Sequence, residues 1–199
     1  MKLGGACGVA AKPLGGQASM KRVTPIVKKP LTCTDAEAKA FCCLVMEGGQ
    51  VLARGLEGRV RSAMALVFLY DGGVGDLAAV AAVKHPHSRY RESVFRNAGA
   101  VQLASGFPLE LGWVFVRPEH RRKHYSRMVC AAAVQSIRPK GRPVFATTRA
   151  DNVAMHRTLG HLGFSRHGQP WDSKRPQEEL VLFVQDISQQ AVAPDGRSA

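Results

Sequence analysis

The chain has 199 residues, of which 45% are hydrophobic and 22% charged, a balance typical of one folded globular domain with a sizeable core. No apolar run approaches the roughly 18–20 residues that cross a bilayer, because Met64 to Tyr70 is followed at once by Asp71, Gly72 and Gly73. The formal net charge of +13 favours a polyanionic partner, either nucleic acid, the ribosome or a nucleotide rich in phosphate. Composition therefore excludes an integral membrane protein and leaves these partner classes open.

The two ends of the sequence differ from its middle. Residues 1–30 contain basic side chains but no Asp or Glu, and they lack the apolar run of a secretory signal. We predict a flexible basic leader at 1–30, with a transit peptide as the alternative, a folded domain at 31–187 and a flexible polar tail at 188–199. The five cysteines form an odd set without a C-x-x-C pair, which predicts reduced thiols and a cytoplasmic location.

Apolar spacing and turn residues predict an α/β domain. Thr34 followed three positions on by Glu37 is typical of a helix-capping box. The first predicted helix starts at this box and ends at Gly48, and it is followed by a hairpin of strands at 62–70 and 76–84 and a short helix at 88–98. The remaining predicted strands are 109–116, 143–148 and 180–184, and the remaining predicted helices are 125–137 and 152–162. This order predicts a mixed sheet with helices packed on it.

The unit that carries chemistry is a strand, a short basic loop and a helix between residues 109 and 137. A helix N-terminus offers free N–H groups and a partial positive charge to a phosphate. Five basic residues lie in or beside the loop, with Glu119 as the single acid: Arg117, Arg121, Arg122, Lys123 and Arg127. By charge alone, this loop is either an anion site or a solvated turn.

The segment from Val114 to Arg127 resembles the pyrophosphate motif of the GCN5-related N-acetyltransferase (GNAT) family. In that motif a strand ending in Val-x-Pro leads to Arg-x-x-Gly-x-Gly/Ala, and the first basic residue and Pro118 match it. Ser126 is a small residue near the pattern, whereas His124 stands where the family has glycine.

A second segment resembles the same family independently. The residues Asn152, Ala154, Gly163 and Phe164 are similar to the family's Asn-x-x-Ala-x-x-x-Tyr-x-x-x-Gly-Phe segment, although Ala154 sits one place early and Leu159 occupies the tyrosine position. Together the two segments cover roughly residues 109–184.

The resemblance implies a GNAT-like fold, with a mixed, mostly antiparallel central sheet flanked by helices. It also implies an acyl-CoA-dependent N-acyltransferase that uses acetyl-CoA by default and acts on an amine that the sequence does not identify. The backbone of Val114, Phe115 and Val116 would bind the pantetheine arm, and Asn152 would contact coenzyme A. The residues implied at the pyrophosphate are Arg121, Arg122, Lys123, His124, Tyr125, Ser126 and Arg127.

Candidate catalytic residues follow from the strand pattern. Strict alternation puts Glu110, Gly112, Val114 and Val116 on one face of the strand, and Leu111, Trp113 and Phe115 on the other. Glu110 is then the candidate base, the alternative being a strand-edge or salt-bridged surface carboxylate.

Leu159 cannot donate a proton, so His156, on the same helix face, is the candidate acid; the alternative is a partly buried helix residue. Thr147 occupies the position where some family members carry another carboxylate, which closes that route.

The sequence alone leaves several functional interpretations open. We predict no metal site and assign His85 and His87 to a loop. A basic segment with interleaved aromatic residues is a candidate lining for the acceptor site, and it comprises Lys84, Arg89, Tyr90, Arg91, Phe95 and Arg96. At helical spacing, the alternative for Phe95 is a position in the core. The alternatives to a general N-acyltransferase are a nucleic-acid- or ribosome-associated acyltransferase and a non-catalytic GNAT-like module that binds acyl-CoA.

Overall fold

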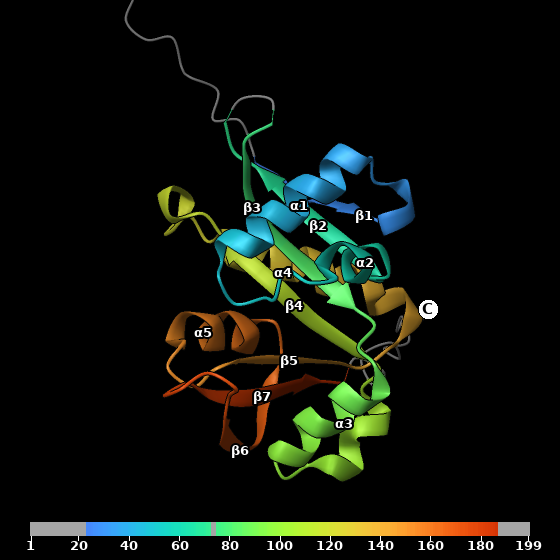
Figure 1. Cartoon of the computed structure of the whole chain (residues 1–199), viewed down its shortest axis with the longest axis vertical. Coiled ribbons are helices and arrows are strands. Elements are labelled where there is room, and N and C mark those ends of the chain that lie inside the picture. The colour runs from blue at the N-terminus through green and yellow to red at the C-terminus, as the bar shows by residue number, and fades with distance from the viewer. Residues whose placement is uncertain (1–22, 73–74, 187–199) are drawn as a thin grey trace, which may run out of the picture.

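A computed structural model describes residues 23–72 and 75–186, and their strands form one seven-stranded sheet in the order β1-β2-β3-β4-β5-β7-β6 (Figure 1). The strands are β1 (Ile26–Lys28), β2 (Ala65–Tyr70), β3 (Leu77–Lys84), β4 (Leu109–Val116), β5 (Val144–Arg149), β6 (Ser165–Asp172) and β7 (Glu179–Gln185). Only β4 and β5 run parallel, and all other neighbours are antiparallel. The predicted mixed, mostly antiparallel sheet is confirmed.

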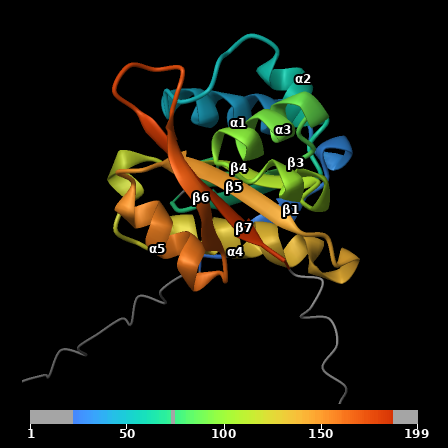
Figure 2. The ribbon, with the colours of Figure 1, turned by 90° about the horizontal axis from the view of Figure 1, so that it is seen from below.

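Helices cover both faces of this sheet. They are α1 (Asp35–Glu47), α2 (Leu56–Arg61), α3 (Ser88–Asn97), α4 (Tyr125–Ile137) and α5 (Val153–His161). Figure 2 shows the sheet between α1, α2 and α3 on one side and α4 and α5 on the other. The molecule is therefore a three-layer α/β/α arrangement.

The apolar spacing of the helices explains this layering. In α4 the buried residues Val129, Cys130 and Ala133 recur at helical spacing and pack on the face of the sheet that carries Val67 and Ala81. Burying a side chain of the Val or Leu type stabilises a fold by roughly 1.5–3 kcal/mol. The stripe on α4 therefore holds this helix against the centre of the sheet.

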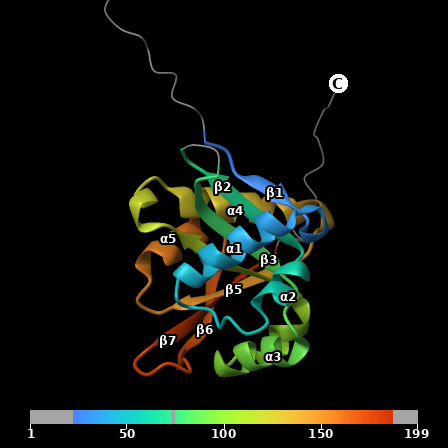
Figure 3. The ribbon, with the colours of Figure 1, turned by 45° about the horizontal axis from the view of Figure 1, so that its top comes forward.

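The opposite face is covered by α1, which begins at the predicted capping box. The Thr34 hydroxyl accepts from the Glu37 amide at 3.2 Å, and the Thr34 amide donates to the Glu37 carboxylate at 3.0 Å. Phe41 of α1 then packs edge-on against Phe68 of β2 with 5.4 Å between ring centroids. Figure 3 shows α1 lying over this face of the sheet. The capping box and the apolar stripe together confirm the predicted first helix.

Three elements were not predicted. β1 lies inside the range expected to be a leader, yet its residues pair with Leu66–Phe68 of β2, so the folded part begins before residue 31. Three residues are too few to show a period of two. α2 and β6 were also missed, since α2 has six residues and β6 is an edge strand with mostly polar, exposed side chains. Residues 1–22 and the expected tail at 188–199 lie outside the described residues.

Two further observations bear on the sequence predictions. Within the residues that the structure describes, no helix is long and apolar enough to cross a membrane. The described cysteines Cys33, Cys42, Cys43 and Cys130 are all free thiols, and burial raises the pKa of Cys130 to about 12.

Candidate functional site

The two parallel strands at the centre of the sheet separate soon after they meet. β4 and β5 pair only at Leu109 with Val144 and at Glu110 with Phe145, although β4 continues to Val116 and β5 to Arg149. In Figure 1 the strands meet at the lower right and diverge toward α5 on the left. Beyond Glu110, the backbone groups of β4 that face β5 therefore have no strand partner among the described residues, so they are available to a ligand.

A β-bulge in β4 changes which side chains share a face. Trp113 has a φ of 51°, and Trp113 with Val114 stands opposite the single residue Ala81. After the bulge, Val114 and Val116 pack on the α4 side with Leu111, while Trp113 and Phe115 pack on the α1 side.

The predicted strict alternation was therefore wrong. Glu110 and Gly112 lie on the opposite face from Val114 and Val116, because the extra residue of the bulge shifts the alternation by one position.

The loop after β4 presents its backbone at the start of α4. Arg122 and His124 both have left-handed backbones, with φ of 63° and 59°. In the described part of the chain, no backbone carbonyl accepts from the N–H groups of Arg122 to His124, and the first N–H groups of α4 are free by the geometry of a helix. His124 is the N-cap residue, but its exposed side chain makes no capping hydrogen bond. This leaves a row of donors of the kind that binds a phosphate.

Carboxylates on neighbouring elements neutralise part of the basic loop. Asp71 accepts from the Lys123 ammonium at 2.7 Å and from the Tyr125 hydroxyl at 2.6 Å, and His120 Nδ1 lies 3.2 Å from the same oxygen. The hydrogen bond from Lys123, followed by that from Tyr125, lowers the pKa of Asp71 to about 2.

Arg117 is paired in the same way, at 3.3 Å from Glu47 and 3.5 Å from Asp76. The exposed side chains of Arg121, Arg122 and Arg127 form no ion pair with any described residue. These three arginines, rather than all five basic residues, are the cations free to meet an anion at the start of α4.

Glu110 lies on the other face of the sheet in a small polar cluster. The residue is 3% exposed, its carboxylate forms an ion pair of 2.8 Å with Lys84 of β3, and it accepts from the Tyr90 hydroxyl at 3.2 Å. Tyr90 belongs to α3, so this hydrogen bond joins α3 to β4. Burial of the hydroxyl, together with the charge of Glu110, raises the pKa of Tyr90 and keeps the phenol protonated.

Sequence reasoning placed Lys84 and Tyr90 in an acceptor-lining segment but did not connect them to Glu110. The connection depends on strand register, since Lys84 and Glu110 are cross-strand partners. Glu110 is salt-bridged, as in the alternative interpretation, but it is buried rather than on the surface.

The second motif lies on α5. Asn152 caps this helix by accepting from the Met155 amide at 3.1 Å, and Leu159 is buried in the core. His156 Nε2 lies 3.0 Å from the Arg149 carbonyl, and its ring packs against Phe183. Because a carbonyl only accepts, Nε2 carries the proton and Nδ1 is the free nitrogen.

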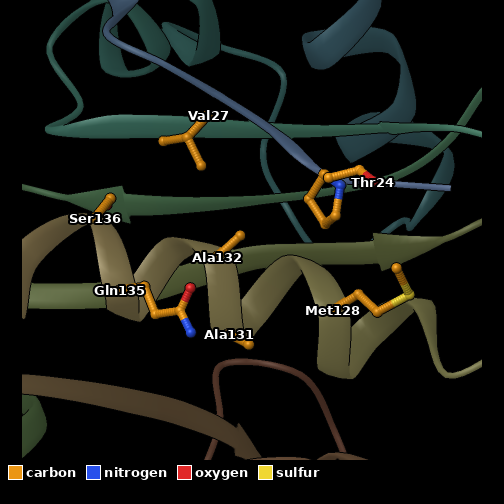
Figure 4. Close-up of a pocket in the computed structure, with 8 residues that line it drawn as sticks. Thr24, Val27, Met128, Ala131, Ala132, Gln135 and Ser136 are labelled. Atoms are coloured by element: carbon orange, nitrogen blue, oxygen red, sulfur yellow. The ribbon is translucent and has the colours of Figure 1, made fainter. Parts of the chain in front are cut away.

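A groove lies away from all of these residues. It has a volume of about 550 Å³ and lies between the segment of β1 and the outer side of α4, as Figure 4 shows. Its lining comprises Thr24, Pro25, Val27, Met128, Ala131, Ala132, Gln135 and Ser136. None of the predicted site residues lines it. Among the described residues there is also no group of three or more His, Cys, Asp or Glu side chains placed to hold a metal ion.

Comparisons with known proteins agree with this geometry. Residues 96–172 match the family described as FR47-like protein, a range that includes β4, the basic loop, α4 and α5. No curated protein matches the sequence significantly. An acyl-CoA N-acyltransferase from Pseudomonas aeruginosa superposes with a TM-score of 0.60 at 15% identity, over 82% of this chain and 99% of its own.

Two other solved structures have the same architecture. The ribosomal-protein-S18-alanine N-acetyltransferase from Escherichia coli superposes with a TM-score of 0.59 at 13% identity, over 88% of this chain and 100% of its own. The yncA protein from Salmonella typhimurium, solved with its cofactor acetyl-CoA, superposes with a TM-score of 0.59 at 16% identity, over 88% and 99% of the two chains.

The chain therefore shares the α/β fold of these solved acyltransferases, including the diverging central strands. More particularly, the chain has the fold of the GCN5-related N-acetyltransferases, and its segment 96–172 carries the FR47-like sequence pattern.

Proposed function

We propose that this protein is an acyl-CoA-dependent N-acyltransferase, with acetyl-CoA as the default donor. The observation that carries the proposal is the combination of diverging strands with a helix start whose N–H groups and three arginines are free. A ligand with an extended polar arm and a pyrophosphate matches both features at once. The amine that accepts the acyl group is not identified by these features.

The donor would bind along β4 and α4. The backbone groups of Val114, Phe115 and Val116 that face β5 would bond the amides of the pantetheine arm. The N–H groups from Arg122 to Arg127 would hold the pyrophosphate, with Arg121, Arg122 and Arg127 adding charge. Asn152, whose Oδ1 caps α5, would offer its amide nitrogen to coenzyme A.

The acceptor would meet the thioester on the other face of the sheet, where Glu110 lies. Acyl transfer needs a neutral amine, and a carboxylate can take its proton. The hydroxyl of Tyr90 donates to Glu110, which fixes the orientation of the carboxylate. His156 would serve as an acid only through Nδ1 of its imidazolium, because Nε2–H is engaged with the Arg149 carbonyl. Coenzyme A can leave as a thiolate without a strong acid, since a thiol pKa is about 8.5.

A non-catalytic module that binds acyl-CoA is the second candidate. Glu110 is already paired with Lys84, and the position of the family tyrosine holds the buried Leu159. Both features lower the capacity for proton transfer without affecting the free N–H groups at α4.

One experiment separates the two candidates. Calorimetry would measure acetyl-CoA binding, and release of free thiol would be followed with a broad panel of amines that includes peptides with free N-termini. Binding together with thiol release supports the acyltransferase. Binding without thiol release above solvent hydrolysis favours the module, and absence of binding rejects both.

A further inference from the structure

The ammonium of Lys84 occupies a place where an acceptor amine would be expected. It forms a 2.8 Å ion pair with Glu110, and it lies 5.2 Å from the centre of the Trp113 ring. A methyl group added at Gly112 would lie 2.8 Å from both Cε and Nζ of Lys84. The absence of a side chain at Gly112 is therefore what allows the lysine to extend across β4.

The direction of the proposed donor brings its thioester to the same place. The pyrophosphate would lie at Arg122 to Arg127 and the pantetheine arm at Val114 to Val116. If the arm continues along β4 toward the N-terminus of the strand, its thioester end would reach the next two residues, Trp113 and Gly112. These are the two residues over which the Lys84 ammonium lies.

The surroundings of Lys84 make it a specific target rather than a generally reactive amine. Its side chain is 17% exposed, whereas Lys39 and Lys174 are exposed on the surface. Lys84 also forms an ion pair with a carboxylate 2.8 Å away, and neither of the other two forms an ion pair with a described residue. An amine, a base and the end of the donor arm are thus brought together within one chain.

We propose that Lys84 is acylated by the acyl-CoA bound to its own chain, an inference that rests on the proposed function. Glu110 takes a proton from the Lys84 ammonium, and the freed nitrogen lone pair forms a bond to the thioester carbonyl carbon. The tetrahedral intermediate collapses with cleavage of the C–S bond. Coenzyme A leaves as the thiolate, the second amine proton passes to solvent, and Lys84 becomes an uncharged amide.

The test uses the full wild-type chain incubated with acetyl-CoA, with peptide mapping by mass spectrometry over time and calorimetry on the same preparation. We expect Lys84 to be acetylated about tenfold or more faster than Lys39 and Lys174, because Lys84 alone of these three has a carboxylate beside it. The rate per molecule should not depend on protein concentration. In protein unfolded by urea, Lys84 should lose this advantage.

A variant gives the matched control. Glu110→Gln should slow acetylation of Lys84 by about tenfold or more and leave the rates at Lys39 and Lys174 unchanged. Acetylation of Lys84 no faster than that of the two exposed lysines, in wild-type protein that binds acetyl-CoA, overturns this inference and leaves the proposed function in place. Absence of acetyl-CoA binding overturns the proposed function itself, and the inference with it.

Discussion

The Tyr125 hydroxyl donates to the Asp71 carboxylate at 2.6 Å, which connects the first residue of α4 to the end of β2. The same carboxylate accepts from the Lys123 ammonium, so Asp71 contacts both ends of the segment 123–125. His124 lies between these two residues, with its left-handed backbone. Asp71 therefore orients the turn whose N–H groups form the candidate phosphate site.

The first prediction concerns this anchor. Asp71→Asn should weaken coenzyme A binding by about threefold to tenfold, because the amide keeps one acceptor but loses the charge that holds Lys123. Calorimetry with coenzyme A measures the effect. Asp172→Asn, an exposed position on β6, is the control and should leave the affinity unchanged. Equal affinity of the Asp71 variant and the parent would remove Asp71 from the proposed site.

The ionisation of Asp71 should also make the stability of the folded protein depend on pH. The pKa of Asp71 is lowered from 3.8 to about 2 in the folded protein, so the ionised form favours folding. The stabilisation is fully present above about pH 4 and is lost as the pH falls through about 2. Urea unfolding of the parent and of Asp71→Asn should therefore differ at pH 5 and converge near pH 2. A difference that persists unchanged at pH 2 would contradict this assignment.

The second prediction concerns the free arginines. The double variant Arg121→Ala with Arg122→Ala should weaken coenzyme A binding about tenfold or more, since charge-assisted hydrogen bonds contribute roughly 1.5–3 kcal/mol each. The matched control is Arg138→Ala with Arg142→Ala, which removes the same charge beyond the other end of α4. A loss below threefold in the first double variant, or equal losses in both, would count against the phosphate site.

Sequence patterns predicted those parts of the fold that depend on local periodicity. The bounds of β4 and α4 agree with the prediction at every residue, because apolar residues repeat strongly there and Pro118 ends the strand. β6 carries mostly polar residues on both faces at the edge of the sheet, so no alternation marks it. Local patterns therefore do not reveal a strand that is held mainly by its neighbour.

The candidate site could be predicted only in part, for a related reason. The basic loop and the helix after it are contiguous in sequence and were found. The bulge at Trp113 was not, since one residue with positive φ leaves no mark in an apolar pattern, and it reversed the predicted faces. The contacts of Asp71 with Tyr125 and of Lys84 with Glu110 join residues 54 and 26 positions apart. The first follows from the packing of α4 on the sheet and the second from the register of β3 with β4, neither of which can be read from local spacing.

The third prediction concerns Glu110. Glu110→Gln should lower turnover by roughly 10²-fold while coenzyme A affinity stays within about twofold, because the carboxylate acts on the amine and not on the nucleotide. Steady-state kinetics and calorimetry provide the two measurements. Glu92→Gln, an exposed position on α3, is the control. Turnover within twofold of the parent would make Glu110 structural.

The same variant has a stability effect that must be measured separately. Removing one partner of a buried ion pair costs roughly 3–5 kcal/mol, and the partial exposure of Lys84 should bring the loss to the lower end of that range or below. Urea unfolding of Glu110→Gln, and of Glu110→Gln combined with Lys84→Met, tests this. Partial recovery of stability in the double variant is expected, because it removes the unpaired cation.

The last prediction concerns His124, which stands where the resembled motif has glycine. Its backbone has φ 59° and ψ 18°, a left-handed conformation that costs a non-glycine residue roughly 1–2 kcal/mol, while its imidazole is exposed and caps nothing. His124→Gly should therefore raise the free energy of unfolding by up to about 1 kcal/mol and keep or improve acetyl-CoA affinity. His124→Ala is the matched control, since it removes the imidazole but keeps the Cβ, and it should give neither gain. Thermal unfolding and calorimetry on the three proteins distinguish the effects. If the parent does not bind acetyl-CoA while the glycine variant binds tightly, the Cβ blocks the pyrophosphate, and the natural protein is a non-catalytic relative.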